Sequence, residues 1–106
     1  MDYRLVYVTT TSYEEAFKIG RAVVEARLAA CANLLGAVKS VYWWQGSLEE
    51  DDEVALLLKT SAACVEQVVA KVQALHSHTC PCVVAVPIAT GSPAFLEWIT
   101  QETRDS

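Results

Sequence analysis

The sequence has no basic patch and no long apolar run. It contains 8 Lys and Arg residues against 13 Asp and Glu residues, and its formal net charge is −5. Nucleic-acid binding relies on Lys and Arg clusters that displace counterions from phosphates, and anionic membranes attract proteins through the same positive charge. A membrane-spanning helix needs about 20 consecutive, mostly apolar residues. We therefore expect no nucleic-acid partner and no membrane partner.

Signals for secretion and for common enzyme classes are also missing. Residues 1–10 do not combine a basic region, a long apolar stretch and a small-residue cleavage site, which predicts a cytoplasmic protein. The sequence has no Gly-rich phosphate-binding loop and no Gly-x-Ser-x-Gly nucleophile elbow. We predict that the protein is not an enzyme, although a nucleophile pair of Cys80 and His78 stays open. In a reducing compartment the four cysteines are expected to remain thiols: Cys31, Cys64, Cys80 and Cys82.

What the sequence does contain fits a single domain over residues 1–106. Hydrophobic residues make up 53% of the chain, slightly above the usual 45–50% or so. A domain of this size buries roughly 65% of its extended surface on folding. The core can therefore form without disulfides or a bound cofactor, and the apolar excess hints at burial in an assembly.

The pattern of strands and helices predicts an α+β fold of the ferredoxin-like type. Each of three helices is expected to follow a serine that can cap it, namely Ser12, Ser61 and Ser92. Ser12 and Glu15 match a capping box, and Gly36 predicts a β-bulge. The order is βαββαβ with a C-terminal helix, which places both main helices on one face of an antiparallel sheet. Runs of β-branched and aromatic residues predict the four strands: 4–10, 31–44, 48–59 and 82–89.

One face of that sheet has no main helix to cover it. The strand over 31–44 is far longer than the usual 5–6 residues or so, so it is expected to project beyond the sheet. Trp43 and Trp44 are adjacent on it and must point to opposite faces. Two interpretations stay open: another subunit covers these side chains, or one tryptophan is exposed beside a turn.

Several segments resemble a known family. They are Leu28–Asn33 (LAACAN), Ser40–Gly46 (SVYWWQG), Glu53–Thr60 (EVALLLKT), Val86–Pro93 and Leu96–Trp98. In this order, over almost the whole chain, they resemble the CutA divalent-cation tolerance proteins. The resemblance implies a ferredoxin-like homotrimer, built like the PII signalling proteins and linked to tolerance of divalent metals, chiefly copper. The alternative is a PII-like regulatory or anchoring scaffold that binds a small ligand or a partner protein in clefts between subunits.

The resemblance also implies two metal ligands, Cys31 and His76, since thiolate and imidazole suit copper and zinc. Thirteen strand steps at about 3.3 Å each would put them at opposite ends of the sheet, on the order of 40 Å apart. Only a neighbouring subunit could then bring them to one metal. A small buried hydrophobe is the alternative interpretation of Cys31.

A second set of candidate ligands is specific to this chain. Where the family usually has His-Pro-Tyr-Glu-Val-Pro-Glu, this sequence has His-Ser-His-Thr-Cys-Pro-Cys over residues 76–82. If this connection is extended, alternate side chains share one face, and Cys80 and Cys82 are too close in sequence for a relaxed disulfide. A polar connection with Cys82 entering the core is the alternative. The acidic run at 49–53 is either a hard-cation site or a solvated hairpin. The candidate soft-metal ligands are Cys31, His76, His78, Cys80 and Cys82.

Overall fold

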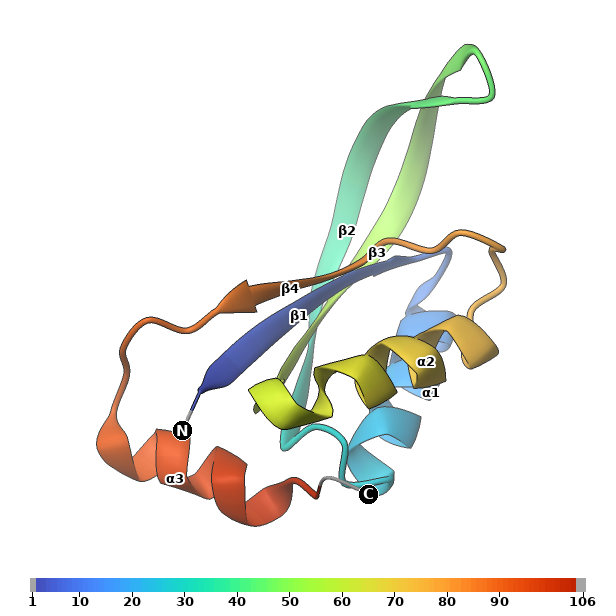
Figure 1. Cartoon of the computed structure of the whole chain (residues 1–106). Coiled ribbons are helices and arrows are strands. Elements are labelled where there is room, and N and C mark those ends of the chain that lie inside the picture. The colour runs from blue at the N-terminus through green and yellow to red at the C-terminus, as the bar shows by residue number, and fades with distance from the viewer. Residues whose placement is uncertain (1, 105–106) are drawn as a thin grey trace.

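A computed structural model describes residues 2–104 of the chain as a four-stranded sheet with three α-helices (Figure 1). The sheet order is β2-β3-β1-β4, and every neighbouring pair is antiparallel, which confirms the ferredoxin-like prediction. Among the described residues, no helix is both long and apolar enough to cross a bilayer. The elements are β1 (Tyr3–Thr10), α1 (Tyr13–Glu25), β2 (Cys31–Trp44), β3 (Ser47–Ser61), a 3₁₀ turn (Ala62–Cys64), α2 (Val65–Leu75), β4 (Val83–Pro87) and α3 (Pro93–Glu102).

The core lies between one face of the sheet and the two helices α1 and α2. Because side chains alternate along a strand, Val6 and Val8 of β1 face the same side as their partners on β3. Ile19 of α1 and Val68 of α2 pack on them, and all are fully buried. A second, smaller cluster lies under α3, which covers one end of the opposite face.

The helix starts follow the predicted signals at two of three places. At α1 the Ser12 hydroxyl accepts the N–H of Glu15 at 3.1 Å, and the Glu15 carboxylate reaches back to the N–H of Thr11 at 2.9 Å. At α3, Ser92 is the N-cap residue and proline occupies the first turn, but the Ser92 side chain makes no capping hydrogen bond. The prediction that Ser61 caps α2 is wrong, because the 3₁₀ turn intervenes and Ser61 makes no capping hydrogen bond.

The β2–β3 hairpin projects beyond the rest of the sheet. β1 pairs with β3 only as far as Thr10 opposite Val54, and from there to the turn β2 and β3 pair only with each other. The projecting part spans roughly 20 Å at the usual rise per residue. It gives the molecule its longest dimension, 44 Å against 25 and 22 Å.

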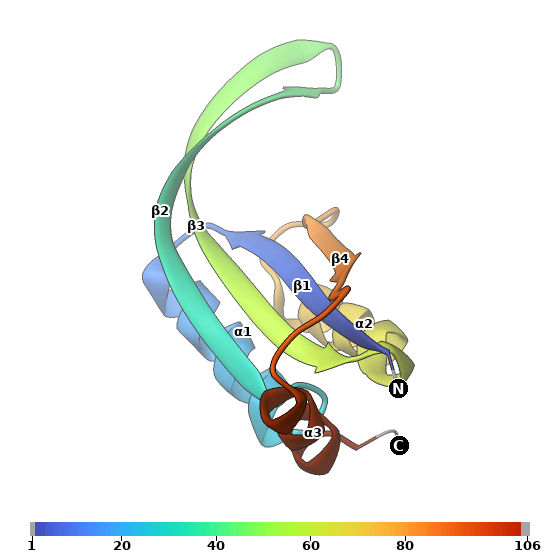
Figure 2. The ribbon, with the colours of Figure 1, turned by 90° about the vertical axis from the view of Figure 1, so that its left-hand side faces the viewer.

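A bulge at the base of the hairpin sets its direction. Leu34 pairs with Leu56 and Gly36 with Ala55, so Leu35 has no partner on β3. Gly36 has a φ of +118°, a conformation that other residues rarely adopt. Bulges bend and twist a strand. Beyond this one the hairpin curls over the face of the sheet that α1 and α2 leave uncovered (Figure 2).

Candidate metal and ligand site

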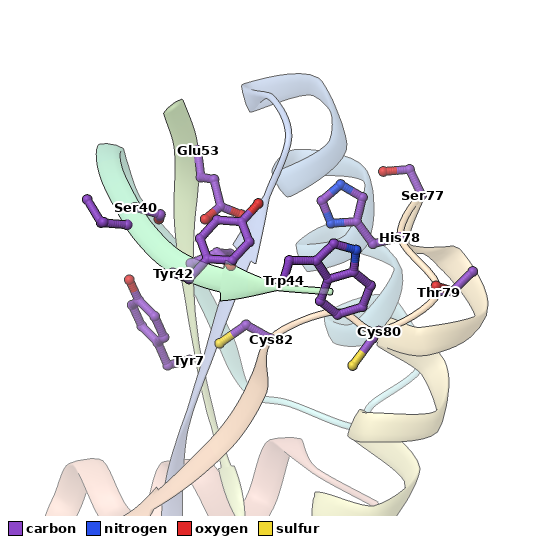
Figure 3. A pocket seen from close by; sticks show the side chains of 12 residues that line it. Tyr7, Ser40, Tyr42, Trp44, Glu53, Ser77, His78, Thr79, Cys80 and Cys82 are labelled. Atoms are coloured by element: carbon purple, nitrogen blue, oxygen red, sulfur yellow. The ribbon is translucent and has the colours of Figure 1, made fainter. Parts of the chain in front are cut away.

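The concave side of the curled hairpin borders an open cavity of about 690 Å³. Three parts of the chain line it: the hairpin, β1, and the connection over 76–82 between α2 and β4 (Figure 3). Residues 76–82 are called the 76–82 connection below. The lining residues used below are Tyr7, Tyr42, Trp44, Glu53, His78, Cys80 and Cys82.

Strand alternation decides which hairpin side chains reach this cavity. Beyond the bulge, Tyr42 and Trp44 of β2 lie on the concave side and line the cavity. Trp43, between them, is 73% exposed and pairs with Leu48 on the convex side. The prediction that Trp43 and Trp44 point to opposite faces is confirmed. One tryptophan therefore belongs to the cavity and the other to the outer surface.

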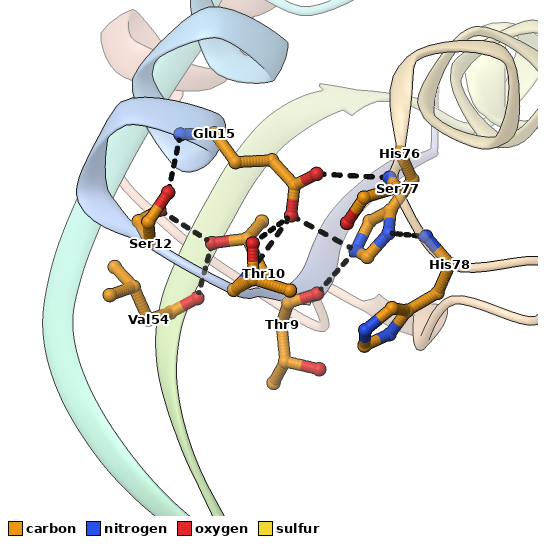
Figure 4. A network of polar contacts seen from close by, with 9 residues as sticks. Thr9, Thr10, Ser12, Glu15, Val54, His76, Ser77 and His78 are labelled. Carbon is orange, nitrogen blue, oxygen red and sulfur yellow. Dashed lines mark hydrogen bonds and ion pairs between the residues drawn. The ribbon is translucent and has the colours of Figure 1, made fainter.

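His76 anchors the start of the 76–82 connection. Its ring is buried, and its Nε2 lies 2.8 Å from the carbonyl oxygen of Thr9 at the end of β1 (Figure 4). Its Nδ1 accepts the backbone N–H of His78 at 3.0 Å. Because Nδ1 accepts a hydrogen bond, Nε2 is the nitrogen that donates to Thr9. Both ring nitrogens are occupied by backbone groups, so His76 holds the connection in place and does not line the cavity.

Glu15 anchors the same segment from α1. One carboxylate oxygen accepts the N–H of Ser77 at 2.9 Å, and the other accepts the N–H of Thr11. Burial favours the neutral acid, but these hydrogen bonds outweigh it and lower the pKa of Glu15 from 4.5 to about 2. The carboxylate also lies 3.9 Å from His76 Nε2. Glu15 is therefore ionised at neutral pH and ties α1 to the connection.

The acidic run on the hairpin does not form one cluster. Alternation places Glu49, Asp51 and Glu53 on one face and Asp52 on the other, where it forms an exposed ion pair with Lys39 at 2.9 Å. Tyr42 donates a hydrogen bond to Asp51. That bond, desolvation and the nearby carboxylates raise the pKa of Tyr42 to about 12. The Tyr42 phenol therefore stays protonated and keeps its hydrogen bond until strongly alkaline pH.

Three of the five predicted metal ligands come together at the cavity. His78, Cys80 and Cys82 line it, and all three side chains are exposed, so Cys82 does not enter the core. Cys31 lies elsewhere, opposite Lys59, half-buried and 3.6 Å from the Asn33 side-chain oxygen. Within residues 2–104, no three His, Cys, Asp or Glu side chains are already arranged to hold a metal ion.

The predicted separation of about 40 Å between Cys31 and His76 is wrong. Cys31 pairs with Lys59, and Thr9, which binds His76, pairs with Ala55 on the same strand. Those β3 positions are four residues apart, or about 13 Å. The prediction failed because the second half of β2, residues 38–44, lies in the projecting hairpin, beyond the position of His76.

Sequence reasoning missed two contributors to the site. Tyr7 faces the cavity from β1, and Glu15 has its second role at Ser77. Alternation along 4–10 could have placed Tyr7 on the uncovered face, but no local signal announces that the hairpin curls over it. The Glu15–Ser77 contact is long-range and has no signature in either segment.

Comparison with known proteins identifies the family. The family model described as "CutA1 divalent ion tolerance protein" matches residues 4–102. The chain belongs to the CutA1 divalent ion tolerance family. It is 42% identical to the divalent-cation tolerance protein CutA of Thermus thermophilus and 39% identical to that of Archaeoglobus fulgidus, in each case over 93% of this chain and 96% of the relative.

Solved CutA structures share the fold described above. The Thermus thermophilus protein superposes with a TM-score of 0.94, covering 96% of this chain and 99% of that one. The CutA1 of Oryza sativa is 34% identical and superposes with a TM-score of 0.95, covering 100% of this chain and 97% of that one. The Archaeoglobus fulgidus protein is described as a periplasmic CutA. It superposes with a TM-score of 0.91, covering 94% of this chain and 97% of that one. The CutA1 description names tolerance to divalent ions and no reaction.

Proposed function

We propose that this CutA1 family member is a homotrimeric, non-enzymatic metal-binding protein that takes copper, or another divalent cation such as zinc, at His78, Cys80 and Cys82. The observation that carries the proposal is that one short connection presents an imidazole and two thiols to a single cavity. Soft thiolate and imidazole donors suit copper and zinc. The three side chains are exposed and not yet arranged around one point, so binding would require them to rotate onto the ion.

The test is a competition titration of the fully reduced protein with Cu(I) and with Zn(II). The variant that combines His78→Ala, Cys80→Ser and Cys82→Ser should lose most of the affinity. Cys31→Ser is the matched control, since Cys31 lies outside the cavity, and it should change the affinity much less. The proposal is wrong if Cys31→Ser alone abolishes binding while the triple variant binds as the wild type does.

The proposal of a trimer rests on apolar surface that a single chain leaves in water. The convex side of the hairpin exposes Trp43 and Leu48, and β4 exposes Val84 and Val86 on the uncovered sheet face. Apolar side chains gathered in this way mark association surfaces. The threefold symmetry itself rests on the resemblance to the family.

We also place the protein in the cytoplasm, where exposed thiols such as Cys80 and Cys82 stay reduced; cell fractionation tests this assignment.

A second candidate is a regulatory scaffold that binds a small molecule in the same cavity. Its volume of about 690 Å³ lies within the range of ligand pockets, about 300–1,000 Å³. Tyr7, Tyr42 and Trp44 give it aromatic walls, which favours an organic ligand over a bare ion. Thermal-shift screening of metabolites with metal-free protein separates the two candidates: a ligand that stabilises the triple variant as well as the wild type supports the scaffold.

A further inference from the structure

Cys80 and Cys82 differ from the other two cysteines in exposure and in proximity to another thiol. Both are exposed and line the cavity, whereas Cys64 is 1% exposed and Cys31 is half-buried on the far part of β2. Only Pro81 separates them. Oxidants reach exposed thiols first, and a second thiol two residues away is available to every sulfur that has been oxidised.

We infer that Cys80 and Cys82 form a reversible dithiol–disulfide pair at the rim of the cavity, oxidised by hydroperoxides. The reaction needs no metal, so the inference stands apart from the proposed function. One thiolate attacks the peroxide O–O bond, becomes a sulfenic acid and releases an alcohol, or water from hydrogen peroxide. The second thiol then attacks that sulfur, the S–S bond forms, and water leaves. In sum, two thiols and one hydroperoxide give one disulfide, one alcohol and one water.

Closure of this disulfide depends on one backbone torsion. A disulfide needs Cα atoms about 4.4–6.8 Å apart, and a fully extended pair two residues apart lies at the upper edge of that range. The connection bends over residues 77–80, so it is not extended along its whole length. Pro81 holds its own φ near −65°, so its ψ is the main torsion that sets the Cα separation of the two cysteines.

The hydrogen bonds of the connection leave this part of the chain able to move. His76 and Ser77 are tied to Thr9 and Glu15 at one end, and Val83 pairs with Val8 at the other. Between them, no hydrogen bond is found at residues 79–81 within the described part of the chain. Closing the ring therefore breaks no hydrogen bond at these three residues.

Such a bridge is expected to be labile. The ring it closes contains a single intervening residue, so the preferred S–S torsion is hard to reach, and strained or exposed disulfides are readily reduced. The pair therefore suits a switch better than a structural staple. If the metal proposal also holds, oxidation removes two of the three donors, and disulfide and metal exclude each other.

Trypsin makes the test unambiguous, because the peptides 28–39, 60–71 and 72–104 separate Cys31, Cys64 and the Cys80–Cys82 pair. The full-length reduced protein is treated with stoichiometric hydrogen peroxide, denatured, alkylated and digested, without and with dithiothreitol before alkylation. We expect peptide 72–104 to escape alkylation, to weigh two hydrogen atoms less than its reduced form, and to regain two alkylation sites after dithiothreitol. The Cys31→Ser/Cys64→Ser variant should behave identically.

The Cys82→Ser variant should lose this species and retain a sulfenic or higher acid at Cys80. A peptide 72–104 that stays doubly alkylated, or that carries only sulfinic acid or a bridge to a second chain, overturns the inference. Metal affinity is measured separately on the reduced protein, so failure of the switch and failure of the metal proposal are distinguishable.

Discussion

The carboxylate of Glu15 accepts the backbone N–H of Ser77 at 2.9 Å, although the two residues are 62 positions apart in the sequence. The same side chain completes the cap of α1 at Thr11. One carboxylate thus couples the start of a helix to the connection that carries His78, Cys80 and Cys82. The hydrogen bonds that hold this contact together are those of the ionised form, so acid should loosen the site before it unfolds the core.

We expect Glu15→Gln to destabilise the fold by about 1–3 kcal/mol near neutral pH, because charged hydrogen bonds are lost. The direction of the pH dependence follows from the lowered pKa of Glu15. The stabilisation is complete above the ordinary value of 4.5 and is lost as the pH falls towards about 2. Urea unfolding between these pH values measures it. Glu14→Gln, exposed in the same turn, is the control, and an unchanged acid dependence in Glu15→Gln contradicts the assignment.

Replacement of His76 should act on stability more than on metal binding. His76→Phe leaves the Thr9 carbonyl and the His78 N–H without their partner in a buried site, at a cost of about 1–3 kcal/mol. Metal affinity should fall less than in His78→Ala, which removes a donor from the cavity. Parallel urea unfolding and Cu(I) titration decide this. His76 is a ligand after all if the two variants lose equal affinity while His76→Phe remains fully stable.

The two tryptophans at the hairpin tip should contribute strongly to assembly. Trp43 and Trp44 are 73% and 44% exposed in a single chain, and a tryptophan that becomes buried typically costs about 3–5 kcal/mol when cut to alanine. Trp43→Ala with Trp44→Ala should therefore weaken the trimer markedly in sedimentation equilibrium at low micromolar concentration. Phe17→Ala, also exposed but on α1, is the comparison. A monomeric wild type, or a double variant that assembles normally, refutes the account.

Gly36→Ala should destabilise the protein by about 1–3 kcal/mol, because a φ of +118° is strained for any residue with a Cβ. The added methyl would also lie 3.4 Å from the Tyr13 hydroxyl. Gly91→Ala is the matched control, since that glycine has no positive φ and its Cβ would meet only the Leu96 side chain at ordinary contact distance. Equal urea midpoints for the two variants would show that the bulge does not depend on glycine.

Local patterns in the sequence predicted those strand limits, caps and bulges that depend only on neighbouring residues. The limits of β2 at Cys31 and Trp44, the cap at Ser12 and the bulge at Gly36 all follow from neighbours within a few residues. The prediction that Ser61 caps α2 failed because a serine can precede a 3₁₀ turn as well as an α-helix. β4 runs from Val83 to Pro87, shorter than the predicted 82–89, because only these five residues pair with β1.

The sequence by itself determined that His78, Cys80 and Cys82 share one short connection and that Trp43 and Trp44 part to opposite faces. Only the tertiary structure decided that this connection meets Trp44 across a cavity, that His76 is turned to Thr9 instead, and that Cys31 lies apart. The physical reason is the distance along the chain over which each kind of interaction acts. Periodicity and capping act over one turn or one strand step, whereas the curl of the hairpin depends on a bulge, a sheet twist and pairings between residues far apart in the chain.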